Sequence, residues 1–161
     1  MLNEFQTNVV WENMLAAETR SLYFGDLATR YTRRKQWITG GSFFLSSGAA
    51  ATIIARSPEI IPIILALAVA IATAYAMAIN LDGKIGTMAK LHASWDSIAA
   101  DYSRLWSHAY EDDSDKELDE IIKRAREFSE LATTDAPNDQ KLMDKWESHV
   151  FAMHHLTGQN G

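Results

Sequence analysis

The chain has no cysteine, only three prolines, and no charged side chain in two long stretches near its middle. The lack of cysteine excludes disulfide bonds, metal sites with thiolate ligands and cysteine nucleophiles. With a net charge of −6 and a pI of about 5.3, the chain lacks the basic surface that neutralises phosphates, so we expect no nucleic-acid partner. Residues 1–10 also lack the basic start and apolar run of a cleavable signal peptide. We therefore expect the apolar stretches themselves to target the chain.

The two uncharged stretches have the length of membrane spans. Twenty residues separate Lys35 from Arg56, and twenty-two separate Glu59 from Asp82. At about 1.5 Å per helical residue, each covers about 30 Å, the thickness of the hydrocarbon core of a bilayer. We predict two transmembrane helices, at about 37–55 and 60–81, which the link 56–59 joins into an antiparallel hairpin. A buried hairpin in a soluble bundle is the alternative, but this short chain would then have to cover a long apolar rod.

Small residues in both spans favour close packing of the helices in the membrane. Membrane helices associate where small side chains let their backbones approach. The first span has Gly41 and Gly48 one heptad apart, and the second has an alanine at every fourth position: Ala66, Ala70, Ala74 and Ala78. These faces either close the hairpin on itself or also join neighbouring chains. Neither span holds a charged residue, which argues against a proton relay or a dedicated ion site.

Basic and aromatic residues set the expected orientation in the membrane. They gather at the start of the first span: Arg30, Arg33, Arg34, Lys35 and Trp37. Lysines also follow the second span, whereas the tip of the hairpin offers only Arg56 beside Glu59. Positive residues dominate cytoplasmic loops and interact there with anionic headgroups. We therefore expect a two-pass protein of the inner membrane with both termini in the cytoplasm.

Apolar residues recur at helical spacing on both sides of the hairpin. Before it, the pattern runs from about Asn8 to Gln36. After it, intervals of three and four residues form a seam typical of a helix that packs on another helix: Leu91, Trp95, Ile98, Tyr102 and Leu105. This seam would meet the first helix of its own chain or join partner chains into an oligomer. We expect the second span to run on into this helix, with a bend near Gly83 and Gly86.

Two more helices are expected towards the C-terminus. Ser114 and Glu117 have the spacing of a capping box, and Asn138 or Asp139 would cap the last helix. The predicted fold is an all-α membrane protein: a two-span transmembrane helical hairpin whose long cytoplasmic helices pack as a helical bundle or coiled coil. It has three parts: residues 1–36, the hairpin 37–81 and residues 82–161.

No group of residues has the spacing of a catalytic or metal site. His149, His154 and His155 lie near the C-terminus, but the interval of five between the first two does not place two ligands on one helical face. The acidic run 111–115 lacks the glycine and the spaced oxygens of a calcium loop. We expect no enzymatic activity, no cofactor and no bound metal.

The order of segments resembles the SLATT family, two-span effector modules associated in bacteria with nucleotide-sensing domains and nucleotide-second-messenger synthases. The resemblance covers about residues 11–131 and rests on the run Arg30-Tyr-Thr-Arg-Arg-Lys-Gln-Trp37, on Trp95 and on Tyr102-Ser-Arg-Leu-Trp106. It implies an oligomeric effector that perturbs the inner membrane, by a pore or by depolarisation, in antiphage defence. Because no fused sensor such as a nucleotide-binding or TIR domain is evident, we expect activation by a sensor or signal-producing protein as partner, or by direct detection through these helices. The alternative is a membrane-anchored adaptor or assembly subunit that docks a partner through its cytoplasmic helices.

Overall fold

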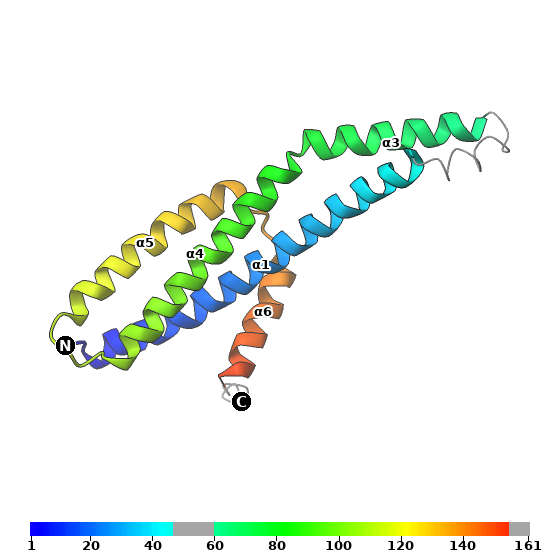
Figure 1. Ribbon diagram of the computed structural model, residues 1–161. Helices are drawn as coiled ribbons and strands as arrows, with labels where there is room; N and C mark the ends of the chain where they lie inside the picture. The colour runs from blue at the N-terminus through cyan, green and yellow to red at the C-terminus, as the bar shows by residue number, and fades with distance from the viewer. Residues whose placement is uncertain (47–59, 155–161) are drawn as a thin grey trace. The chain divides into compact units, whose positions relative to one another are not determined.

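The computed structural model describes residues 1–46 and 60–154 (Figure 1). These residues form helices α1 (Glu4–Ser46), α3 (Ile60–Ala78), α4 (Leu81–Ser107), α5 (Ser114–Asp135) and α6 (Gln140–Met153). No strand occurs within the two described ranges, which confirms the predicted all-α class. The chain divides into two compact units, which we call the helical module (Met1–Leu27 with Thr87–Gly161) and the apolar unit (Ala28–Gly86). The boundaries expected near residues 36 and 81 mark changes in polarity along the sequence, whereas these two units are defined by their compactness. The expected boundaries therefore stay predictions.

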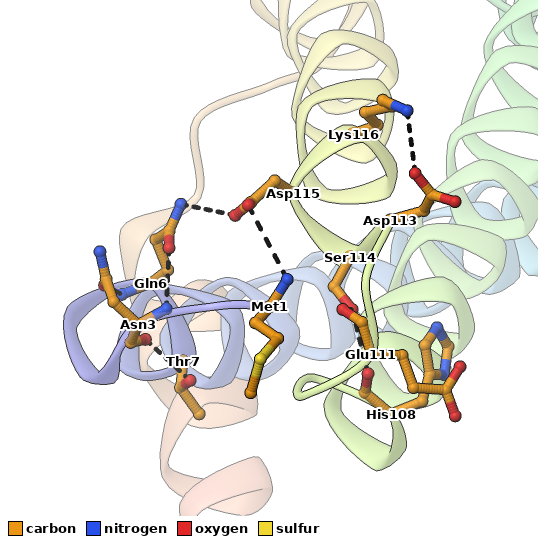
Figure 2. Close-up of polar contacts among 10 residues, drawn as sticks. All are labelled: Met1, Asn3, Gln6, Thr7, His108, Glu111, Asp113, Ser114, Asp115 and Lys116. Atoms are coloured by element: carbon orange, nitrogen blue, oxygen red, sulfur yellow. Dashed lines mark hydrogen bonds and ion pairs between the residues drawn. The ribbon is translucent and has the colours of Figure 1, made fainter.

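Helix α1 is longer than the sequence pattern suggested. We expected one helix to end near Gln36 and a span to begin at Trp37, but a single helix runs from Glu4 to Ser46. Its start is capped reciprocally, because Asn3 Oδ1 accepts from the Gln6 amide at 2.8 Å and Gln6 Oε1 accepts from the Asn3 amide at 2.9 Å (Figure 2). No proline follows to interrupt it before residue 46. The rest of the expected first span, with Gly48, lies outside the described residues.

The core of the helical module forms where α1, α4, α5 and α6 meet. The predicted seam of α4 lies in this core, with side-chain exposures between 0% and 2% at Leu91, Trp95, Ile98, Tyr102 and Leu105. Helix α1 contributes Val10, Met14 and Phe24, and Ile121 of α5 and Val150 of α6 complete the cluster. Figure 1 shows α4 beside α5 and the first part of α1. The seam therefore packs against helices of its own chain.

The turn between α4 and α5 closes against the N-terminus of the chain. The Leu2 amide donates to the Ala109 carbonyl at 2.8 Å. The Gln6 side-chain amide donates to Asp115 Oδ1 at 3.0 Å, and the N-terminal amine lies 4.0 Å from the other carboxylate oxygen of Asp115 (Figure 2). These contacts hold the first turn of α1 beside the first turn of α5.

The capping box predicted from Ser114 and Glu117 is wrong. Asp113 occupies the N-cap position of α5 and makes no capping hydrogen bond through its side chain. Ser114 is buried, and its hydroxyl lies within hydrogen-bonding distance of two carbonyls of the preceding turn, 3.0 Å from His108 O and 2.9 Å from Glu111 O (Figure 2). Glu117 instead pairs with His108, at 2.9 Å between Oε2 and Nε2. The serine therefore stabilises the turn rather than the helix end.

Helix α6 is capped and then fixed against α1 by side chains. Asp139, one of the two predicted caps, accepts from the Leu142 amide at 3.2 Å. The Trp146 indole donates to Asp26 Oδ2 at 3.2 Å, and His154 Nε2 lies 2.8 Å from Glu18 Oε2. His149 is exposed and its ring lies against that of Trp146, whereas His155 is outside the described residues. Of the histidines near the C-terminus, His154 thus serves to dock α6.

The break between α3 and α4 lies before the glycines where we expected it. Helix α3 ends at Ala78, three residues short of the predicted end of the span, and α4 begins at Leu81. Asn80 has a positive φ of 46°, which asparagine tolerates better than most residues. Its side-chain oxygen accepts from the Gly83 amide at 3.3 Å and so caps α4. Gly83 and Gly86 lie inside α4, so the predicted bend at these residues is wrong.

Candidate membrane surface

Helix α3 presents an apolar surface that the rest of the chain leaves uncovered. Its 19 residues extend about 28 Å at the usual helical rise, enough for the core of a bilayer. It is the single helix of the described ranges that is long and apolar enough to cross a membrane, and none of its residues is buried. Large side chains stand exposed along it: Ile60, Ile61, Ile63, Ile64, Leu67, Ile71, Tyr75 and Met77. An apolar helix in the core of a soluble protein would instead be covered.

The sides of α3 differ in exposure. The half-buried positions of α3 recur every three or four residues, at Pro62, Leu65, Val69, Ala72 and Ala76. The alanines of the predicted packing face fall outside this set, since Ala66, Ala70, Ala74 and Ala78 are all exposed. Within the described residues these four alanines do not close α3 onto α1. Their face remains open to lipid or to another chain.

The last turns of α1 also carry exposed apolar side chains. Trp37 is 82% exposed, and Phe43 and Phe44 are exposed as well. We expected Gly41 to mark a close approach of the two spans, but a Cβ atom added there would meet nothing within 4 Å. No atom in the described part of the apolar unit approaches Gly41 closely, and its packing in a membrane stays a prediction. Its predicted partner Gly48 lies outside the described residues.

A belt of basic residues precedes these aromatic side chains on α1. Arg30, Arg33, Arg34 and Lys35 are all exposed, and the Arg34 guanidinium carbon lies 5.9 Å from the centre of the Tyr31 ring. Lys35 Nζ is 2.6 Å from Asp82 Oδ1 at the start of α4. Both side chains are exposed, so this ion pair adds little to stability. The belt places positive charge one to two turns before the exposed Trp37.

A cavity of about 670 Å³ opens within the apolar unit, between α1 and the α3–α4 junction. The Lys35–Asp82 pair and Asn80 line one part of it, and Thr39 and Ser42 add hydroxyl groups. Apolar walls come from Ile38, Phe43, Ala76 and Met77. A space that is charged at one part and apolar elsewhere suits an amphiphile such as a lipid. Its lining holds one carboxylate, that of Asp82, which pairs with Lys35.

Two residues that shape this site, Asn80 and Asp82, were not among those expected from the sequence. A signal for the first was present, because asparagine immediately after an apolar run is a common helix start. The partner of Asp82 could not be found in the same way, since 47 positions separate it from Lys35 and the pairing depends on how α1 meets α4.

No protein-family model matches the chain, and searches of curated proteins and of solved structures find no significant similarity. The assignment of a function therefore depends on the residues and geometry described above.

Proposed function

We propose that the chain is a two-span protein of the inner membrane, with α3 as one span and the uncharged stretch predicted at 37–55, which begins in the last turns of α1, as the other. The observation that carries this proposal is that no residue of the apolar helix α3 is buried. The basic belt on α1 and Lys84 after α3 favour a cytoplasmic location for both termini. The tip, residues 56–59, would then face the periplasm.

A topology experiment tests this arrangement. We predict that a reporter inserted within residues 56–59 reads as periplasmic, whereas fusions at either terminus read as cytoplasmic. Replacing Arg33, Arg34 and Lys35 together by glutamate should impair this orientation, because the positive charge that holds the start of the span inside is lost. Glutamate at Lys123 and Arg126 of α5 and at Lys141 of α6 is the matched control, since those exposed residues are far in sequence from both spans. A cytoplasmic reading at the tip would exclude the hairpin.

Within this membrane setting we propose an effector that perturbs the inner membrane in antiphage defence, triggered by a partner or a signal. Support comes from the exposed alanine face of α3, which leaves a surface for assembly of several chains. The SLATT-like order of segments adds to it. Because α3 contains no charged residue, a pore would be lined by small and hydroxyl side chains or would open at the borders between chains.

The second candidate is a membrane-anchored adaptor or assembly subunit. It is favoured by the seam of α4, which is buried by its own chain and leaves a closed helical module to dock a partner. Induced expression separates the two candidates, with membrane potential followed by a fluorescent dye. An effector depolarises the cells when its neighbouring genes and natural trigger are supplied, and an adaptor does not.

A further inference from the structure

Lys35 and Asp82 bring together one end of each uncharged stretch. Lys35 is the last charged residue before the first stretch, and Asp82 is the first charged residue after the second. Lys35 Nζ lies 2.6 Å from Asp82 Oδ1. The start of the first stretch and the end of the second therefore lie at the same level. In the proposed two-span arrangement, this level is the cytoplasmic boundary of the hydrocarbon core.

The cavity of about 670 Å³ extends from this ion pair along the apolar unit. Its lining residues fall between positions 35 and 43 of α1, and between positions 73 and 82, from α3 to the start of α4. Each of these ranges covers about 12–14 Å at the usual helical rise. The cavity thus runs from the polar boundary into the apolar zone, as a phospholipid does. Its volume lies in the range of small-molecule sites, about 300–1,000 Å³.

Both charged groups of the cavity are accessible to a ligand. The side chain of Lys35 is 50% exposed, and that of Asp82 is 73% exposed. Their contact uses one of the three donors of the ammonium group and one of the two oxygens of the carboxylate. An exposed ion pair is weak, so its atoms can turn to a ligand at little cost in stability. Thr39 and Asn80, which are also exposed, add polar groups to the lining.

The charges of the lining balance, which favours a zwitterion over an anion. Among the described residues that line the cavity, Lys35 carries the one positive charge and Asp82 the one negative charge. A headgroup with a phosphate and an ammonium group matches both of them. An anionic lipid would be repelled by Asp82 here and finds better partners outside the cavity, at the exposed Arg30, Arg33 and Arg34.

The rest of the lining supplies apolar surface. Ile38 and Phe43 of α1 and Ala76 and Met77 of α3 contribute to it. These residues belong to the uncharged stretches, so they lie on the side of the ion pair where acyl chains lie in a bilayer. A small soluble zwitterion has no group that would cover this surface. The arrangement thus fits a lipid rather than a free metabolite.

We propose that this cavity binds one molecule of phosphatidylethanolamine from the cytoplasmic leaflet. Lys35 holds the phosphate group, Asp82 accepts hydrogen bonds from the primary ammonium group, and the acyl chains lie along the apolar walls. Phosphatidylcholine carries the same charges, but its methylated nitrogen has no proton to donate to Asp82. The inference rests on the proposed two-span arrangement and is independent of the choice between effector and adaptor.

The test is a competition between two lipids that differ only at the headgroup nitrogen. The full chain is purified in a neutral maltoside detergent and mixed with equimolar dioleoyl phosphatidylethanolamine and dioleoyl phosphatidylcholine. Native mass spectrometry then measures how much of each lipid stays bound. We expect about two- to fivefold more bound phosphatidylethanolamine, the effect of one exposed charged contact. Glycerophosphoethanolamine, the same headgroup without acyl chains, should not displace it at equal concentration.

Variants of the ion pair assign the effect to the cavity. Asp82→Asn should remove the preference, because the ammonium group loses its charged acceptor, whereas Asp82→Glu keeps the carboxylate and should retain the preference. Lys35→Gln should lower the binding of both lipids, since both carry the phosphate. Asp96→Asn and Lys84→Gln change exposed residues of α4 that do not line the cavity, and they should bind as the wild type does. Circular dichroism shows whether each variant keeps its helices.

Four results would each overturn the inference: equal binding of the two lipids by the wild type, a preference that survives in Asp82→Asn, unchanged binding by Lys35→Gln, or displacement by glycerophosphoethanolamine. They would leave the two-span arrangement intact, because the topology reporters test it separately. A chain that stays soluble and monomeric without detergent and retains neither lipid would overturn both.

Discussion

Single residues of the helical module divide sharply into those that the chain covers and those that it leaves in solvent. Leu105 has no exposed side-chain surface, although its neighbour Trp106 is 40% exposed. Phe5, in the first turn of α1, is 75% exposed. Whether an apolar side chain stabilises the module therefore depends on its position on the helix and not on its residue type alone.

This difference leads to the first prediction at the scale of the residue. Leu105→Ala should lower the free energy of unfolding by about 2–5 kcal/mol, because it removes buried methyl groups and leaves a cavity. Phe5→Ala removes a larger side chain but should change stability by less than about 0.5 kcal/mol. Urea unfolding of the detergent-solubilised chain, followed by tryptophan fluorescence, measures both. Equal effects of the two substitutions would show that the seam of α4 is not buried.

Tyr102 gives a prediction for alkaline pH. Burial raises the pKa of its hydroxyl above the usual value, and the positive charges of Arg20 and Arg124 only partly oppose this. In the unfolded chain the pKa returns to about 10. The folded state thus binds the proton more tightly, so the stability contribution is fully present below about pH 10 and is lost as the pH rises through the folded pKa.

The measurement is the midpoint of urea unfolding between pH 8 and pH 11.5, in the wild type and in Tyr102→Phe. The wild type should lose stability more steeply above about pH 10 than the variant, which has no proton to release at this position. The two proteins differ only at position 102, so the difference between the two curves isolates Tyr102. Parallel curves would contradict the burial of its hydroxyl.

At the scale of the element, the cap at the start of α4 depends on Gly83. The sequence pattern singled out this glycine as the site of a bend. A Cβ atom added at Gly83 would lie 2.4 Å from the Asn80 side-chain nitrogen, whereas one added at Gly86 would meet nothing within 4 Å. In a helix interior, glycine to alanine gains about 0.5–1 kcal/mol. Loss of an N-cap costs about 1 kcal/mol, because the first amides of the helix lose their acceptor.

We therefore predict that Gly86→Ala stabilises the chain and that Gly83→Ala does not. In Gly83→Ala the Asn80 side chain must swing away, so the loss of the cap offsets the gain in helix propensity. The difference in unfolding free energy between the two variants should be about 1 kcal/mol. If Asn80→Ala abolishes this difference, the cap is its cause; an unchanged difference would refute that explanation.

The accuracy of the sequence-based predictions varied with the kind of signal. The helical periodicity of α4 and α5 and the Asp139 cap were predicted because they are local patterns of residue type. The capping box at Ser114 failed because Ser114 binds two carbonyls of a turn whose course depends on the packing of α1 against α5. The position of the break at Asn80 was missed because two glycines gave the stronger local signal. The pairing of Lys35 with Asp82 and the meeting of Arg20 with Trp95 require tertiary contacts that spacing does not encode.

At the scale of the whole molecule, polarity separates the chain into two environments. The helical module covers its own apolar residues, as the burial of the α4 seam shows. The apolar unit buries no residue of α3. At about 25 cal/mol per Å² of apolar surface, a chain in water gains much from covering such a helix with lipid or with other chains. Whether lipid alone or neighbouring chains also cover the alanine face decides between the two proposed functions.

The last prediction separates these cases through substitutions on two faces of α3. Ala70→Leu with Ala74→Leu adds bulk to the exposed face without reducing hydrophobicity, so insertion should survive while assembly of several chains fails. For an effector, depolarisation after induction should then fall at equal protein level on a blot. Ala70→Gly with Ala74→Gly keeps the face small and should retain the activity.

The same leucine pair at the half-buried Ala72 and Ala76 is the matched control, and it should disturb packing against α1 and lower the protein level. Depolarisation that persists at full strength in the Ala70 and Ala74 leucine variant would exclude this face from assembly, and a wild type that never depolarises cells under its natural trigger would leave the adaptor.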